Sequence, residues 1–273
     1  MFKRGIVGTQ FNWIFTLVTG VVFLSLLFGF GMKYVELQKE KQAYEIAFGV
    51  DAVISGLVGV ETVKSFSSTV DFDFGFYCDS LWVNGLARKD LRNNVVFGGR
   101  DITSDSLLFF TKSFERPFKV RDIIYVADLD KKICFIGDDG GLKEQLPESV
   151  NLVNSNCDLT VYFSAGSVRD DEMRIYGDTV MFSDGKTSDV YGSDELKIGA
   201  IVAENKLNYD CALDELNSTY SVVKDIYLYR ASSGCHSTLN SYLNSATFIN
   251  PLEAEIISAN SNLLSFSGCE VVF

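Results

Sequence analysis

The sequence predicts an α+β protein: an N-terminal transmembrane helix, a helical stalk, then a mostly antiparallel, β-rich ectodomain with C-terminal helices. Three observations lead to this expectation. Residues 5–32 carry no charge, helical periodicity continues beyond them, and the apolar period changes to two near Val70. The expected strands come early and the expected helices late, which favours α+β over an alternating α/β order.

The uncharged run is long enough to cross a bilayer. A bilayer core needs about 20 helical residues, and residues 13–32 supply them. A cleaved secretory signal would have a shorter apolar region and a small-x-small site, which residues 28–32 do not offer. We therefore expect an uncleaved signal-anchor. Basic and aromatic residues flank it, as is typical of membrane interfaces: Lys3, Arg4, Trp13, Lys33 and Tyr34.

Basic residues near the two ends of this run are almost balanced, so the positive-inside rule does not decide the orientation. Residues 33–273 carry 22 basic and 36 acidic side chains, hold all six cysteines and contain the sequon Asn217-Ser218-Thr219. This combination favours an exported domain. The prediction is a cell-membrane protein with a cytoplasmic N-terminus, an extracytoplasmic C-terminal domain and Asn217 as a glycosylation candidate.

Helical periodicity continues to about residue 58, with Tyr34, Leu37, Tyr44 and Phe48 on one stripe that Lys41 interrupts. We expect this face to be solvated or docked on the chain's own head, and pairing with a second copy stays open. Gly49, Gly56 and Gly59 mark where the helix should weaken and end. The expected divisions are an anchor (1–32), a stalk (33–62), a β-rich region (63–147) and an α/β region (148–273), with one ectodomain (63–273) as the alternative.

Residues 70–76 alternate apolar and polar side chains and predict a half-buried strand with Val70, Phe72, Phe74 and Phe76 facing inward. Asn84-Gly85 predicts a tight turn. Further strands are expected at 94–97, 107–111, 122–127, 132–136, 159–163, 174–176, 180–182 and 197–203, with 122–127 and 132–136 forming a hairpin. Helices are expected at 210–229 and from the cap Asn250-Pro251 to about residue 266.

The composition excludes several functions. The net charge is −12, which repels nucleic-acid phosphates, and a single histidine excludes multi-histidine metal sites. Gly185-Lys186-Thr187 lacks the earlier glycine of a phosphate-binding loop, since Val180 stands there. We expect no catalytic residues, no cofactor and no metal site. Several acidic clusters contain the carboxylates that Ca²⁺ prefers, but we expect them to lie in solvated loops. They are Asp184, Asp189, Asp194 and Glu195; Asp128 and Asp130; Asp138 and Asp139; and residues 169–172.

The six cysteines are too widely spaced for a zinc site, and an even number in an exported domain predicts disulfides. At least two bridges are expected, with Cys235–Cys269 favoured because it would staple the C-terminal helix to the preceding one. Buried free thiols in a cytosolic domain are the alternative. Cys235 also stands beside the only histidine, His236, but sequence neighbours rarely form a nucleophile–base pair. The candidates are Cys78, Cys134, Cys157, Cys211, Cys235 and Cys269.

The start of the chain, Lys3-Arg4-Gly5-Ile6-Val7-Gly8, resembles the leader junction of archaeal type IV pilins and archaellins, where a basic pair and a glycine precede the cleaved bond. A long N-terminal helix leading into a cysteine-bearing, β-rich head is also the pilin plan. The chain departs from those leaders in having Gln10 where an acidic residue would stand and only five residues before the cleavage point.

The whole chain is similar to the uncharacterised single-pass surface proteins of small-genome archaea. The similar stretches are residues 11–15 (FNWIF) and residues 116–120 (RPFKV). This resemblance implies a surface location and no known activity.

The sequence thus favours a non-enzymatic, membrane-anchored cell-surface protein with a structural or adhesive role. The alternatives are a type IV pilin-like filament subunit processed after Gly5 and a membrane-anchored carboxylate hydrolase. The first expected partner is the lipid bilayer, and nucleic acid is not expected. Self-association through the N-terminal helix and contacts with other surface proteins remain open.

Overall fold

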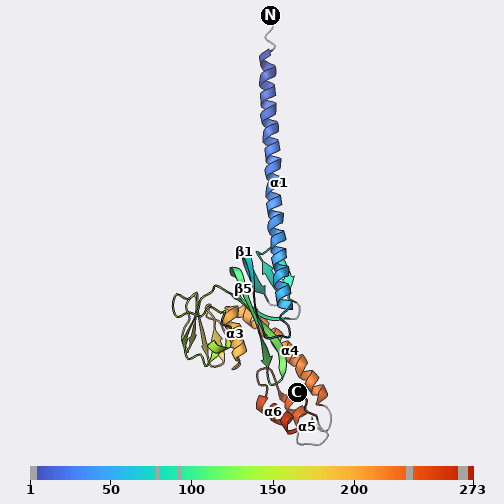
Figure 1. Ribbon diagram of the computed structural model, residues 1–273, viewed down its shortest axis with the longest axis vertical. Coiled ribbons are helices and arrows are strands. Elements are labelled where there is room, and N and C mark those ends of the chain that lie inside the picture. The colour runs from blue at the N-terminus through green and yellow to red at the C-terminus, as the bar shows by residue number, and fades with distance from the viewer. Residues whose placement is uncertain (1–4, 78–79, 92–93, 232–235, 264–269) are drawn as a thin grey trace.

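The computed structural model describes residues 5–77, 80–91, 94–231, 236–263 and 270–273. A single long helix, α1 (Gly5–Ser55), projects from a head built of two sheets and several shorter helices (Figure 1). Its 51 residues correspond to a rod of about 75 Å. The predicted α+β class, with a long apolar helix before a mostly antiparallel domain and C-terminal helices, is confirmed.

The last turns of α1 pack against the head, and the periodic stripe of the stalk is exposed, which is one of its two expected states. Tyr34, Leu37, Tyr44 and Phe48 are all exposed. Small and aliphatic side chains on an adjacent face of the helix are buried instead. The alanines on this face let the helix axis approach the sheet closely. Gly49 has the same role, since a Cβ there would lie 2.9 Å from the Phe66 ring. The buried face consists of Ala43, Ala47, Val50 and Ile54, with Leu57 just beyond the helix.

Sheet A has the strand order β3-β2-β1-β5-β6-β4. Its neighbouring strands are antiparallel except for β4 and β6, which are parallel. Asn84 and Gly85 have φ values of 52° and 64°, so the expected tight turn joins β2 to β3. The strands are β1 (Val63–Tyr77), β2 (Ser80–Val83), β3 (Ala87–Asp90), β4 (Val95–Gly98), β5 (Ile102–Glu115) and β6 (Lys119–Asp128).

One inward residue of the alternating run was predicted incorrectly. Phe72, Phe74 and Phe76 are buried against α1, but Val70 is exposed. The register between β1 and β5 shifts between Ser67 and Phe72, so the alternation of faces does not extend back to Val70. The strand itself begins at Val63, well before the alternating run.

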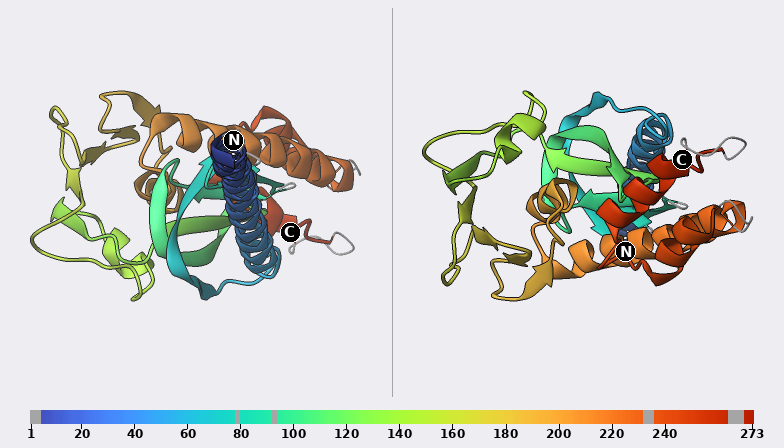
Figure 2. Two further views of the ribbon diagram at one scale, coloured as in Figure 1. Left: turned by 90° about the horizontal axis from the view of Figure 1, so that it is seen from above. Right: turned by 90° about the horizontal axis from the view of Figure 1, so that it is seen from below.

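Sheet B lies beside sheet A and has the order β11-β10-β9-β8-β7 (Figure 2). The hairpin expected from 122–127 and 132–136 does not form, because β6 belongs to sheet A while β7 pairs in parallel with β8 in sheet B. Apolar strands close in sequence had suggested pairing, but the chain changes sheets between them. The strands are β7 (Ile133–Gly137), β8 (Leu159–Phe163), β9 (Glu172–Tyr176), β10 (Thr179–Met181) and β11 (Thr187–Asp189).

The expected strand at 197–203 is instead part of α3 (Asp194–Ala203). Ser193 caps this helix by accepting a hydrogen bond from the Leu196 amide. Most of the helix is buried, and apolar residues lie on most of its sides. Its sequence therefore shows neither the helical period of 3.6 residues nor the strand period of two clearly. A buried helix segment and a buried strand are indistinguishable under that condition.

Two helices, α5 (Ser237–Ser245) and α6 (Glu253–Asn262), lie at the end of the head away from α1 (Figure 1). The expected helix at 210–229 is present within the longer α4 (Lys206–Arg230), which Asn205 caps. Asn250 does not cap the last helix, because it forms a turn with Thr247 and the helix starts three residues later. Helix α2 spans Leu142–Gln145, and the expected extension of α6 to residue 266 falls outside the described residues.

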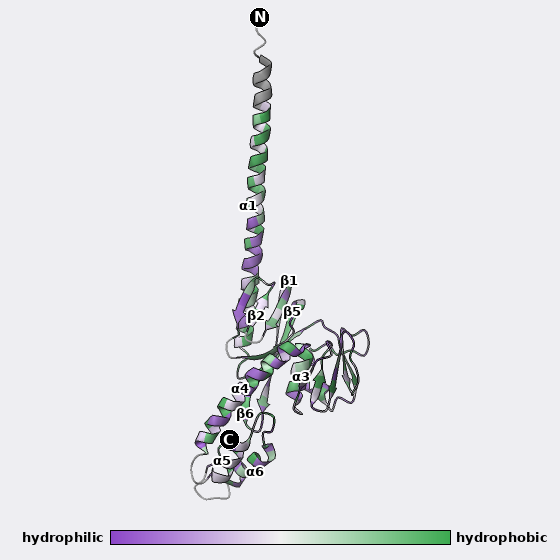
Figure 3. Ribbon diagram, turned by 180° about the vertical axis from the view of Figure 1, so that it is seen from behind, coloured by the Kyte–Doolittle hydropathy of each residue, from purple (hydrophilic) through white to green (hydrophobic). Residues whose placement is uncertain are grey.

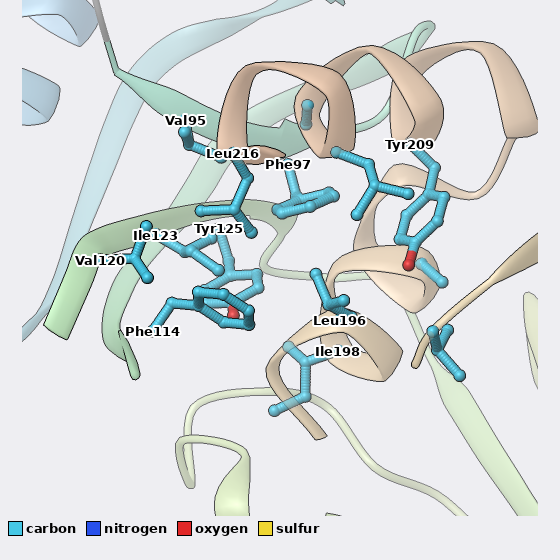
Figure 4. Packing of buried hydrophobic residues seen from close by; sticks show 14 of the residues in the cluster. Val95, Phe97, Phe114, Val120, Ile123, Tyr125, Leu196, Ile198, Tyr209 and Leu216 are labelled. Atoms are coloured by element: carbon cyan, nitrogen blue, oxygen red, sulfur yellow. The ribbon is translucent and has the colours of Figure 1, made fainter. Parts of the chain in front are cut away.

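The larger apolar cluster lies between sheet A, α3 and α4. Figure 4 shows Phe97 and Tyr125 of sheet A facing Leu196 of α3 and Leu216 of α4. The Phe97 and Tyr125 rings stack with centroids 6.0 Å apart. This cluster includes residues on both sides of Pro147, among them Val161 of sheet B, so one core joins the two sheets.

Candidate functional sites

The N-terminal part of α1 is the first candidate site. The stretch Trp13–Ser55 contains a window with a mean hydropathy of 2.2, and none of that window is buried. Figure 3 shows the change along α1 from hydrophobic residues to the hydrophilic stalk that meets the head. By length and composition, this helix could span a membrane.

The flanking residues expected at the membrane interface lie on or near this helix. Trp13 and Tyr34 are both exposed and lie at the two ends of the apolar segment 13–32, and Lys33 is exposed beside Tyr34. Lys3 and Arg4 lie outside the described residues. Residues 13–42 are exposed throughout, so the head covers none of the apolar segment.

Cysteine pairing is only partly visible in the described chain. Cys134 of β7 forms a disulfide with Cys157, with their Cα atoms 5.6 Å apart. Cys211 of α4 is also disulfide-bonded. Cys78, Cys235 and Cys269 lie outside the described residues, and so does the predicted Cys235–Cys269 bridge. The Cys134–Cys157 bridge closes the connection between β7 and β8.

Three of the acidic residues considered for a cation site contact other side chains. Asp184 forms an ion pair with Lys186 at 2.8 Å, and this contact lowers the Asp184 pKa. Asp194 pairs with Lys197 at 2.7 Å, and Glu195 accepts a hydrogen bond from Ser193. Across the described parts of the chain, no group of three or more His, Cys, Asp and Glu side chains converges as a metal site would require.

The residues resembling a phosphate loop form a turn. Gly185 and Lys186 connect β10 to β11, and the Gly185 amide donates to the Phe182 carbonyl oxygen at 2.8 Å. These residues thus form a polar turn between two strands. His236 Nε2 lies 2.9 Å from the Glu270 carbonyl oxygen, while its neighbour Cys235 is outside the described residues.

Asn217 lies on an exposed turn of α4. The sequon residue Thr219 donates its hydroxyl to the Glu215 carbonyl oxygen at 2.9 Å, one helical turn back. Glycosylation of Asn217 stays a prediction.

A groove of about 720 Å³ on sheet A was not anticipated from the sequence. Much of its lining comes from β1 positions that alternate with Phe72, Phe74 and Phe76 and therefore face away from α1. Helix α4 packs mainly on β4 and β6 rather than on the β1–β3 end of the sheet. The groove is thus formed where the sheet extends past its covering helix.

Cross-strand register builds one side of the groove. Gly75 of β1 is opposite Trp82 of β2, and Trp82 is opposite Arg88 of β3. Directly opposed side chains in antiparallel strands lie on the same face and close together. The Arg88 guanidinium accordingly lies over the Trp82 ring, with its Cζ atom 5.4 Å from the ring centroid.

A second arginine–aromatic pair forms the other side. Arg100 Nε donates to the Tyr77 hydroxyl at 3.3 Å, and the Arg100 Cζ atom is 5.4 Å from the Tyr77 ring centroid. The hydrogen bond to Tyr77 raises the pKa of Arg100. A Cβ on Gly75 would lie 2.6 Å from Tyr77 Cε2 and 2.8 Å from the Arg100 carbonyl oxygen. The absence of a side chain at Gly75 therefore allows this pair to close over the strand.

The groove also contains hydrogen-bond acceptors. Asp73 and Asp101 line it, and Asp73 accepts a hydrogen bond of 2.7 Å from Thr103, its cross-strand neighbour. Aromatic faces, fixed cationic donors and carboxylate acceptors together suit the binding of a polar ring compound.

No protein-family model, curated protein or solved structure matches the chain.

Proposed function

We propose that this chain is a single-pass, membrane-anchored cell-surface protein that holds its head outside the cell in a structural or adhesive role. The observation that supports this most is the division of α1. Its first part is apolar and entirely exposed, while Ala43, Val50 and Ile54 in its last part belong to the core of the head. One helix therefore connects a segment suited to lipid with a folded domain.

This arrangement fixes the distance between head and bilayer. If residues 13–32 occupy the membrane, the stalk from Lys33 to the first buried residue, Ala43, corresponds to about 15 Å of helix. A continuous helix resists bending more than an extended linker would. Such a spacer is useful to a displayed domain, and the groove on sheet A gives that domain a surface for recognition.

Two features support an extracytoplasmic head. Cysteines paired in disulfides persist in oxidising compartments, and Cys134–Cys157 is such a pair. The head and stalk also carry all 36 acidic residues, while the N-terminal end of the apolar run has Lys3 and Arg4. Lys33, Lys39 and Lys41 follow the run and balance this charge, so the positive-inside rule does not decide the orientation and the disulfide carries the argument.

Membrane extraction and protease accessibility test this proposal. Alkaline carbonate should leave the full-length protein in the membrane pellet, and protease added to intact cells should digest the head while sparing about 30 N-terminal residues. Release by carbonate would reject the anchor. Digestion only after lysis would reverse the orientation.

A substitution sharpens the test of the anchor. Leu24→Arg places a charge near the middle of the span, where it costs about 3 kcal/mol on the insertion scale. We expect this variant to be partly released by carbonate. Val222→Arg, on an exposed position of α4, is the matched control and should be retained like the wild type.

A second candidate function is that of a pilin-like filament subunit processed after Gly5. Its support is the exposed stripe on the stalk, where Tyr34, Leu37 and Phe48 extend the apolar surface of α1 beyond the proposed membrane span. Helices that pack against one another in a filament would cover such a surface. Processing at Gly5 distinguishes this candidate from a permanently anchored protein.

A further inference from the structure

The two arginines of the groove supply its positive charge. Arg88 and Arg100 each lie over an aromatic ring, and neither forms an ion pair within the described residues. Arg174 and Arg230 also lie over aromatic rings and form no ion pair among the described residues, so that state alone does not mark a site. Arg88 and Arg100 differ in lining one groove together, where a bound anion would accept hydrogen bonds from two guanidinium groups.

The geometry describes the anion further. Trp82 and Tyr77 contribute aromatic surface on the two sides of Gly75, and each ring fixes the position of its guanidinium through a cation–π contact. A ring compound could lie against the aromatic surface while its charged group reaches an arginine. The volume of about 720 Å³ is within the range of small-molecule sites.

The carboxylates limit how much negative charge the ligand can carry. Asp73 and Asp101 line the same groove, so a polyphosphate or a strongly acidic peptide would meet repulsion as well as attraction. A ligand with one carboxylate on a ring rich in hydroxyl groups avoids this conflict. Its hydroxyls would donate to the aspartates, and its carboxylate would accept from the arginines.

We propose that this groove binds an acidic saccharide, a pyranose that carries a carboxylate, such as a uronic acid within a glycan chain. The proposal rests on the adhesive role proposed above, because it names the kind of surface that the head would recognise. An acidic peptide is the competing ligand, and the distribution of Asp73 and Asp101 disfavours it.

The test is a calorimetric titration of the full-length protein in lipid nanodiscs. The probes are a short oligogalacturonate, the neutral oligogalactose of equal length and a short polyglutamate. We expect saturable binding of oligogalacturonate only. Binding of the neutral sugar with equal affinity, preference for polyglutamate, or no binding of oligogalacturonate would each overturn the proposal.

Variants locate the binding in the groove. Arg88→Gln and Arg100→Gln should each weaken oligogalacturonate binding by about tenfold, because each removes a charge-assisted hydrogen bond. Arg88→Lys should recover only part of the loss, since a lysine lacks the planar fork. Arg230→Gln is the matched control, because Arg230 is also exposed and also lies over a tyrosine, Tyr227, but on α4 outside the groove.

The position of the two arginines on the surface keeps these variants interpretable. Both are exposed, and an unchanged near-ultraviolet circular dichroism spectrum would show that the head remains folded. Unaltered affinity in folded Arg88→Gln and Arg100→Gln would place the ligand elsewhere and reject the groove. The binding measurement does not depend on membrane orientation. A failure to bind oligogalacturonate would therefore leave the proposal of a membrane anchor standing. Conversely, release of the protein from membranes by carbonate would leave the binding proposal standing.

Discussion

Lys89 of β3 forms an ion pair with Asp51 of α1, with Nζ 3.1 Å from Oδ2. The same ammonium group lies 4.4 Å from the ring centroid of Phe48, one turn earlier on the helix. Both partners of the ion pair are about three-quarters buried, so water screens them less than it would a surface pair. These contacts, together with the apolar face of α1, hold the head on the helix that carries it.

The apolar face should contribute more to that attachment than the ion pair. Ile54 is fully buried between α1 and sheet A, and Ile54→Ala should lower the free energy of unfolding of the head by about 2–5 kcal/mol. Denaturant titration of the full chain in detergent measures this change. Ile226→Ala, at an exposed position of α4, is the matched control and should change stability by less than about 0.5 kcal/mol. Equal effects of the two substitutions would contradict the packing described here.

Local patterns in the sequence predict much of this fold, and they fail where tertiary contacts decide. The alternation around Phe72, Phe74 and Phe76 locates a strand because one face is buried. Residues 197–203 mislead because helix α3 is buried on most sides. The pairing of β7 with β8 across about 20 residues of chain cannot be read from neighbouring strands, since the sheet partner is distant in sequence.

The anchor could be predicted from local sequence, whereas the groove could not. The anchor is a property of one continuous segment, so composition alone identifies it. The groove depends on the register that places Gly75, Trp82 and Arg88 in one row across three strands. One signal was available, since Tyr77 follows the polar face of the alternating run, where an aromatic residue is unexpected.

The disulfide between Cys134 and Cys157 should stabilise the part of the head that contains sheet B. The two residues are separated by 23 positions, and closing a loop of this size is worth about 3 kcal/mol in the chain-entropy model. The double substitution Cys134→Ala/Cys157→Ala should lower the free energy of unfolding by roughly that amount. Peptide mapping without reduction should recover the linked pair from the wild type. Two alkylatable thiols at these positions in freshly purified protein would contradict the bridge.

Tyr220 should be replaceable by phenylalanine without loss of stability. Its ring is buried and stacks on Phe118, but its hydroxyl finds no hydrogen-bond partner among the described residues. Removing an unsatisfied buried hydroxyl should raise the free energy of unfolding by about 1 kcal/mol. Tyr125→Phe is the matched control, because the Tyr125 hydroxyl donates to the Glu195 carbonyl oxygen at 3.0 Å. That variant should lose about 1 kcal/mol, and the reverse order of the two would contradict the hydrogen-bond assignment.

Buried tyrosines should make the head less stable at alkaline pH. Burial raises the pKa of Tyr220 from 10.0 to about 12, and burial raises the pKa values of Tyr125 and Tyr209 as well. The folded state thus retains phenolic protons that the unfolded state loses, so this stabilisation is complete below pH 10 and decreases as the pH rises toward 12. Denaturant titrations over this range, with tyrosinate absorbance followed in parallel, measure the effect. Tyr220→Phe should show a shallower loss, and an equal loss would contradict the assignment to Tyr220.

The N-terminus should remain uncleaved if the chain is a permanent anchor. In the proposed orientation, Lys3 and Arg4 would keep the N-terminus at the cytoplasmic face, because moving such charges into hydrocarbon costs several kcal/mol. A filament subunit must lose them before its helix can leave the bilayer. The neutral Gln10 departs from the pilin-like pattern, so we expect membrane-extracted protein to retain the residues before Ile6. N-terminal sequencing decides the matter: a chain that begins at Ile6, above all in a sedimentable filament fraction, would favour the filament subunit over the anchored protein.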